Sequence, residues 1–253
     1  MRRLYPTLPP ALPPPFTQYL TPPPLFPARP DTIFYIGDSH TLSLAHVSLP
    51  LPTPLQVIPA VCTGLKASHV RATSSSSFFT VANLTLILSR LPAAATTVLF
   101  SCGEIDCREG IGGPVYQQYT ISNDEALWSE IKAMIEARVR SYLTSLVALF
   151  HEHAPHVQEI LVMPVLPHAR RSKDSGRAAA REPRRRTIFA FNSALKAVCS
   201  MSEELLLVDC FENVADEDGC LKKEYDCDGT HANNAIRGHV ARAIMNTTCR
   251  LID

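Results

Sequence analysis

Three residues of this 253-residue chain, Ser39, Asp228 and His231, are of the types that together carry out acyl transfer. Ser39 follows the apolar run 32–36 and Gly37, which is where a strand would end. Asp228 and His231 share one short loop, so the carboxylate can hold one imidazole nitrogen while the other faces a nucleophile. A serine hydroxyl becomes a good nucleophile only when a base takes its proton. We therefore predict Ser39 as nucleophile, His231 as base and Asp228 as the group that orients the base.

The segments that must position these residues alternate between strand-length apolar runs and longer runs of helical period. This pattern is typical of βαβ units and a parallel sheet. In an open parallel sheet, side chains that act on ligands gather at the carboxyl ends of the strands. We predict strands at 32–36, 55–61, 97–101, 159–165 and 205–210, and helices at 80–91, 124–153, 187–201 and 233–245.

The composition predicts one large α/β domain at 31–253, because 46% of the residues are hydrophobic. Residues 1–30 are rich in proline and are expected to form a disordered leader, with a docking site for a proline-binding module as the alternative. Residues 170–186 hold eight basic residues and no apolar face, which favours a solvated, mobile insertion. The alternatives for this segment are a phosphate-binding patch or a nuclear localisation signal.

The overall charge and the length of the apolar runs limit the expected partners. A formal net charge of zero gives no general attraction to nucleic acid, so no nucleic-acid partner is expected. No apolar run is long enough to span a membrane, so we expect a cytoplasmic protein without a membrane partner. No group of residues has metal-ligand spacing and no glycine-rich loop suits a phosphate, so neither a metal nor a cofactor is expected. The sequence specifies no oligomeric state.

The motifs and their order resemble the SGNH, or GDSL-type, hydrolase superfamily. Gly37-Asp38-Ser39 resembles its first block, and Asp228 with His231 resembles its last. The resemblance implies a three-layer α/β/α sandwich with a five-stranded parallel sheet of flavodoxin-like type. It also implies that the Ser39 amide donates to the oxyanion, and that Gly64, in the loop after the second strand, supplies a second backbone donor.

The third block departs from the superfamily pattern. Its usual Gly-x-Asn-Asp aligns with residues 103–106, so Ile105 replaces the asparagine that donates to the oxyanion. Loss of one such donor typically costs about a hundred- to a thousandfold in rate. We hypothesise that Arg108 supplies the missing positive charge or clamps an anionic substrate group, with Glu104 or Asp106 orienting it. The alternative is an ion pair that only braces the loop.

These features predict a serine esterase of carboxylesterase type that acts through an acyl-enzyme on Ser39, with an atypical oxyanion hole. The substrate is expected to be a small-molecule, glycan or lipid ester, such as a small acyl group on a carbohydrate or lipid. An O-acyltransferase with the same triad, a non-catalytic module that binds an anion or glycan, and a flavodoxin-like protein with coincidental motifs are the alternatives. His40 is expected to point away from the site.

Overall fold

The computed structural model describes residues 31–70, 78–109, 111, 117–119, 122, 124–170 and 181–249. The expectations for the leader at 1–30 and for 171–180 of the basic segment lie outside these residues. Among the described helices, none is both long and apolar enough to cross a membrane.

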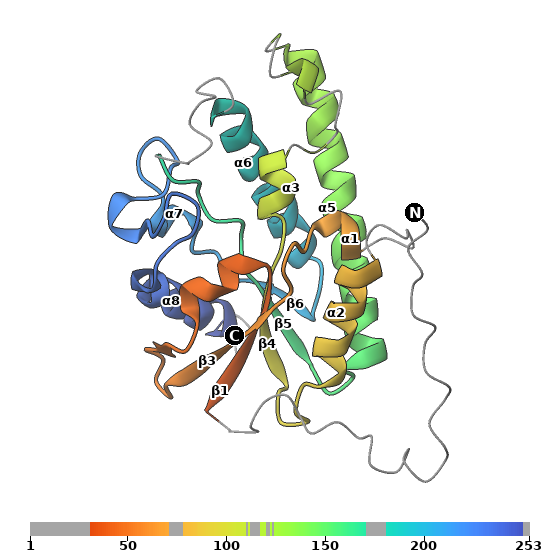
Figure 1. The fold of residues 1–253 in the computed structure, drawn as a ribbon, viewed down its shortest axis with the longest axis vertical. Helices are drawn as coiled ribbons and strands as arrows, with labels where there is room; N and C mark the ends of the chain where they lie inside the picture. Colours follow the sequence, from red (N-terminus) through yellow and green to blue (C-terminus); the bar gives the residue numbers. More distant parts are fainter. Residues whose placement is uncertain are drawn as a thin grey trace, which may run out of the picture.

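A six-stranded sheet forms the centre of the fold, in the order β2-β3-β1-β4-β5-β6 (Figure 1). Five strands are parallel, as predicted, whereas the unpredicted β2 pairs antiparallel with β3 at one edge. Because the chain passes from β1 outward to β3 and then back to β4, the carboxyl end of β1 lies at the point where the strand order reverses. The strands are β1 Thr32–Gly37, β2 Ser48–Leu49, β3 Leu55–Val61, β4 Thr97–Ser101, β5 Glu159–Val162 and β6 Leu205–Leu207.

Two of the strands are shorter than the sequence predicts. β5 ends at Val162 instead of residue 165, since Pro164 has no N–H to donate to a neighbouring strand. β6 ends at Leu207 because the chain turns there, with the Cys210 N–H donating to the Val208 carbonyl at 2.8 Å. Both ends therefore become loops at the same edge of the sheet.

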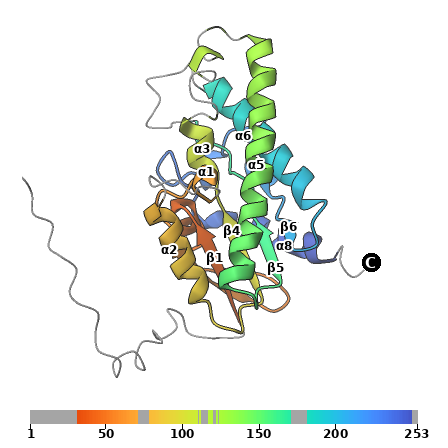
Figure 2. The same cartoon turned by 90° about the vertical axis from the view of Figure 1, so that its right-hand side faces the viewer.

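Helices cover both faces, as the three-layer prediction requires. Helices α2 and α5 lie side by side on one face (Figure 2), where α1 and α6 also pack. Helix α8 covers the other face, with η2 and η6 at its side. Three further short helices lie in loops. The bounds are η2 Ser39–Leu44, α1 Ala67–Val70, α2 Phe78–Ser89, α3 Glu104–Glu109, α5 Glu125–His153, α6 Arg181–Cys199, α7 Phe211–Val214, η5 Lys223–Tyr225, η6 Asn234–Ile236 and α8 Arg237–Cys249.

Helix α6 corrects the prediction for the basic segment. It begins at Arg181 instead of residue 187, so residues 181–186 are helical and are not part of a solvated insertion. Arg184, Arg185 and Arg186 form ion pairs with Glu104, Glu182 and Glu125, respectively. The Arg185–Glu182 pair has the i,i+3 spacing of a helix, whereas Glu104 and Glu125 belong to other helices and no pattern within the segment indicates them.

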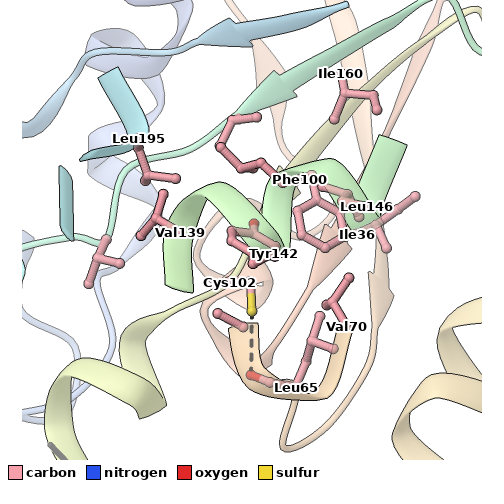
Figure 3. Packing of buried hydrophobic residues seen from close by; sticks show 14 of the residues in the cluster. Ile36, Leu65, Val70, Phe100, Cys102, Val139, Tyr142, Leu146, Ile160 and Leu195 are labelled. Carbon is pink, nitrogen blue, oxygen red and sulfur yellow. Dashed lines mark hydrogen bonds between the residues drawn. The ribbon is translucent and has the colours of Figure 1, made fainter. Parts of the chain in front are cut away.

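The larger part of the core lies between the sheet and α5. The apolar residues of α5 form a stripe along one face whose central members are buried, and Tyr142 and Leu146 pack against Phe100 of β4 (Figure 3). The Cys102 Sγ lies 3.8 Å from the Leu65 carbonyl oxygen and behaves here as a small buried hydrophobe. This packing holds the ends of β3 and β4, and the loops that follow them, in fixed positions.

The exit of β1 requires a glycine. Gly37 has φ +156°, and a Cβ placed on it would lie 2.2 Å from the Ser101 carbonyl oxygen of β4. The contact is with backbone, which cannot rotate away as a side chain can. Any larger residue would therefore push β1 and β4 apart directly before Ser39.

We expect Gly37→Ala to lower the free energy of unfolding by about 2 kcal/mol or more, because the new methyl group overpacks the β1–β4 contact. Gly238→Ala is the matched control, since Gly238 lies in α8 and a methyl group added to it would meet nothing within 4 Å. That substitution should leave stability unchanged or raise it by up to about 1 kcal/mol. Urea denaturation measures both, and equal effects would contradict the proposed close approach.

Candidate active site

Ser39 is held at the sheet edge by the start of a short helix. Asp38 is the N-cap of η2, and its Oδ1 accepts the His40 N–H at 2.9 Å. Burial raises the pKa of the Asp38 carboxyl, which is 2% exposed. Ser39 is the first residue of η2, where backbone N–H groups have no partner within the helix. The Ser39 amide therefore has no partner within η2, and it lies with the Ser39 hydroxyl at the end of β1.

The loop that carries Asp228 and His231 is shaped by its own hydrogen bonds. Asp228 Oδ1 accepts the N–H groups of Thr230 and His231, each at 2.9 Å. Gly229 adopts φ +85°, a conformation that side chains disfavour, and its N–H donates to Asp226 at 2.7 Å. The loop thus folds back on itself and presents His231 toward η2.

The structure brings Ser39, His231 and Asp228 into one line of contacts across 192 residues of sequence. Ser39 Oγ lies 3.0 Å from His231 Nε2, and His231 Nδ1 lies 3.0 Å from Asp228 Oδ2. An ionised carboxylate only accepts, so Nδ1 carries the proton and donates to Asp228, while Nε2 accepts from the serine hydroxyl. Hydrogen bonds from the His231 backbone and side chain hold the pKa of Asp228 well below its usual range.

Glu104 occupies the centre of the altered third block. Its side chain is 9% exposed and is surrounded by three groups that carry or can carry positive charge. Arg184 Nη2 donates to Glu104 Oε1 at 2.8 Å, Arg108 Nε lies 3.7 Å from the same oxygen, and His40 Nε2 lies 3.6 Å from Oε2. Burial alone would raise the pKa of Glu104, but contact with His40 and the two arginines outweighs it and lowers that pKa.

His40 faces the site, contrary to the expectation that it points away. Its ring centroid lies 4.8 Å from that of His231, and its other neighbours are the carboxylates of Glu104 and Asp38. Burial lowers the pKa of His40, but those two carboxylates more than offset this, so the pKa is raised overall. The Asp38 cap turns the chain into η2 directly after β1, and this turn directs His40 inward. The only feature of the sequence that could have indicated this position of His40 is Glu104, an acidic residue that follows the neighbouring strand β4.

The remaining predicted site residues have different surroundings. Asp106 accepts the Ala67 N–H at 2.7 Å and lies 4.0 Å from Arg138, so it braces the chain between α3 and α1. Of the two acids predicted to orient Arg108, Glu104 is therefore the one that pairs with it. Gly64 has φ +74°, and a methyl group added to it would meet nothing within 4 Å. It thus borders open space in the loop after β3.

A small cavity lies behind the site, lined by residues that include Asp38, His40, Ser101 and Glu104. Its volume is about 10 Å³, which is space for a single water. Across the described part of the chain, no three His, Cys, Asp or Glu side chains gather so as to hold a metal ion.

Several solved structures are similar to this chain, whereas no family model and no curated protein matches it. A protein assigned as an acylhydrolase from Bacteroides fragilis has 12% identity and a TM-score of 0.52, covering 94% of each chain. A lipase from a goat rumen metagenome has 13% identity and a TM-score of 0.51, covering 85% of this chain and 96% of its own. A protein assigned as a platelet activating factor from Streptococcus pneumonia has 17% identity and a TM-score of 0.51, covering 91% of this chain and 86% of its own.

The chain shares the mixed α/β fold of these structures, with a largely parallel central sheet, as the sequence predicted. Similarity at this level of identity establishes the fold and leaves the reaction to the chemistry of the site. Ile105 stands where the superfamily pattern has an asparagine, and the residues that surround the neighbouring Glu104 come from three elements.

We expect the energetic coupling between His40 and Glu104 to depend on pH. A histidine whose pKa is raised on folding contributes stability in full below its unfolded pKa and loses it as pH rises through the folded pKa. Double-mutant cycles with His40→Gln and Glu104→Gln should therefore give a coupling of about 1 kcal/mol or more at about pH 5.5 and a smaller one at about pH 9.5. The measurement is urea denaturation of the four proteins, and a coupling that is equal at both pH values would refute the assignment.

Proposed function

We propose that this protein is a serine esterase that cleaves an acyl ester through an acyl-enzyme on Ser39. The observation that carries the proposal is the pair of 3.0 Å contacts from Ser39 Oγ to His231 Nε2 and from His231 Nδ1 to Asp228 Oδ2. These distances lie within the range in which a base takes a proton from a nucleophile. The similarity in fold to lipase and acylhydrolase structures supports the same reaction class.

The reaction follows from the direction of these hydrogen bonds. His231 Nε2 takes the hydroxyl proton as Ser39 Oγ bonds to the ester carbonyl carbon, and the carbonyl oxygen becomes an oxyanion. When the intermediate collapses, the C–O bond to the alcohol breaks and His231 returns the proton to the leaving oxygen. A water then attacks the acyl-enzyme by the same route, releasing the acid and restoring Ser39. Asp228 stays ionised throughout and stabilises the charged imidazole.

The oxyanion is held, in this proposal, by backbone donors. One donor is the Ser39 amide at the start of η2. The other is the amide of Gly64, a residue whose Cα borders open space. Ile105 supplies no side-chain donor, so the amides act without the third partner of the superfamily pattern. Arg108 and Arg184 pair with the Glu104 carboxylate, which in turn contacts His40. Their positive charge is therefore assigned to Glu104 in this proposal and not to the oxyanion.

The proposed substrate is a small acyl group carried by a carbohydrate or lipid alcohol. The resemblance to the superfamily motifs around Ser39 supports this substrate class, and it extends to either kind of alcohol. The same chemistry with a sugar hydroxyl in place of water would make the protein an O-acyltransferase.

A fluorophosphonate probe should label the wild-type protein at Ser39, because His231 activates that hydroxyl. Ser39→Ala should not be labelled. Ser129→Ala is the matched control, since that serine is exposed on α5 and its hydroxyl donates to the Glu125 carbonyl of its own helix. Equal labelling of Ser39→Ala and wild type, measured by intact mass, would sink the proposal. Labelling at Ser39 without hydrolysis of any simple ester would favour the transferase.

His231→Gln should lower kcat for 4-nitrophenyl acetate by at least about a hundredfold, because proton transfer to and from the serine is lost. Asp228→Asn should lower kcat by a smaller factor, since its side chain is 43% exposed and water can partly replace the carboxylate. Glu224→Gln, which removes a charge from an exposed residue of the same loop, should leave kcat within about twofold. A similar loss in all three variants would point to disruption of the loop instead of loss of the base.

A further inference from the structure

The cluster around Glu104 contains more positive than negative charge. One carboxylate faces the guanidinium groups of Arg108 and Arg184, and His40 adds a third positive charge when protonated. With the Asp38 carboxylate beside His40 counted as well, these side chains carry one net positive charge when His40 is protonated and none when it is neutral. Burying a charge away from water is costly unless it has a partner, so this excess favours an anion at the site.

The two arginines also have donors to spare. A guanidinium has five N–H groups, and within the described residues the Arg184 side chain forms one hydrogen bond, from Nη2 to Glu104. Its Nε is buried and has no hydrogen-bond partner there. Arg108 lies 3.7 Å from Glu104, beyond hydrogen-bond distance, and its side chain is 34% exposed. Glu104 therefore anchors both groups, and most of their donors have no hydrogen-bond partner among the described residues.

The next two arginines of α6 show what a satisfied structural arginine looks like in this protein. Arg185 donates through Nε and Nη2 to the two carboxylate oxygens of Glu182. Arg186 pairs with both oxygens of Glu125, donates to the Tyr119 hydroxyl and stacks over Trp128 at 4.3 Å. Arg185 and Arg186 each form a bidentate pair with a carboxylate of their own. Arg184 and Arg108 differ from them because they share one carboxylate between two guanidinium groups.

The position of the cluster connects it to the proposed reaction. Helices α3 and α6, which supply Arg108 and Arg184, lie side by side beyond the carboxyl ends of the strands (Figure 1). His40 bridges the cluster to the triad, since it contacts Glu104 on one side and the His231 ring on the other. An anion held by the arginines would therefore lie close to an ester bound at Ser39.

We propose that Arg108 and Arg184, anchored by Glu104, form a subsite for an anionic group of the substrate, so that the preferred ester carries a carboxylate, phosphate or sulfate. The inference rests on the proposed esterase function and specifies its substrate class. The guanidinium groups bind the anion by charge-assisted, bidentate hydrogen bonds. Glu104 positions the arginines and does not contact the reacting atoms.

The test compares aryl acetates that share the acetyl group and differ only in the para substituent of the ring. The wild type should hydrolyse 4-acetoxybenzoate with kcat/KM about tenfold or more above that of the neutral 4-acetoxybenzamide, after correction for their uncatalysed rates. The acetates of 4-hydroxyphenyl phosphate and of 4-hydroxyphenyl sulfate show which anion fits best. Added salt should lower the rates of the anionic esters more than that of the amide.

Arg108→Ala and Arg184→Ala should each lower the ratio of kcat/KM for the anionic ester to kcat/KM for the amide by about tenfold. Arg140→Ala, at an exposed arginine of α5 whose side chain forms no ion pair with the described residues, removes the same charge elsewhere and should retain the preference. Equal kcat/KM for anionic and neutral esters in the wild type would overturn the proposal. So would an equal loss on both esters in a folded Arg108→Ala protein, because that result indicates a structural or oxyanion role.

A binding measurement separates failure of the subsite from failure of the esterase. Calorimetric titration of Ser39→Ala with benzoate, inorganic phosphate and sulfate should show binding of at least one of them, weakened about tenfold by Arg108→Ala in the same background. Benzamide is the neutral control and should bind no better to Ser39→Ala than to the double variant. Anion binding without any ester hydrolysis would reject the esterase and keep the subsite, whereas hydrolysis without anion binding or preference would reject the subsite alone.

Discussion

The close approach of β1 and β4 at Gly37 is the constraint on which the site depends. The Cβ of any other residue would lie 2.2 Å from the Ser101 carbonyl oxygen, so a glycine lets the two strands stay paired to their ends. The chain can then turn at Asp38, whose carboxylate caps η2 and fixes the first residues of that helix. The direction of the Ser39 hydroxyl, its amide and the His40 ring all follow from this turn. The candidate site is thus built on the exit of a central strand.

The second requirement is a balance of buried charge. Glu104, which occupies the variable position of the third block, is a carboxylate largely removed from water. Such a group is stable only with charged partners, and the structure provides them from η2, α3 and α6. One of these partners, His40, also lies beside the His231 ring. The third block therefore differs from the superfamily pattern by the loss of a side-chain donor at Ile105, and Glu104 beside it gathers buried charge next to the site.

Much of the fold was predictable because it depends on local patterns. The parallel strands, the α5 stripe and the Asp124 cap all follow from periodicity and from one capping residue. The two-residue β2 was not predictable, since two residues carry no periodic signal. The start of α6 was mispredicted because its basic first turns look solvated in sequence. They are helical here, with arginines that pair to Glu104, Glu125 and Glu182.

The sequence by itself determined the α/β class, the glycine that ends β1, and the residue types and loop spacing of Ser39, Asp228 and His231. These features depend on short-range geometry that a few neighbouring residues specify. Only the tertiary structure decided that His40 faces His231, that Asp106 braces α1 while Glu104 enters the site, and that Arg184 joins Arg108 there. These are contacts between residues up to 191 positions apart along the chain, from His40 to His231. The order of the strands and the need to pair buried charges determine which residues meet, and neither can be inferred from a single segment of the sequence.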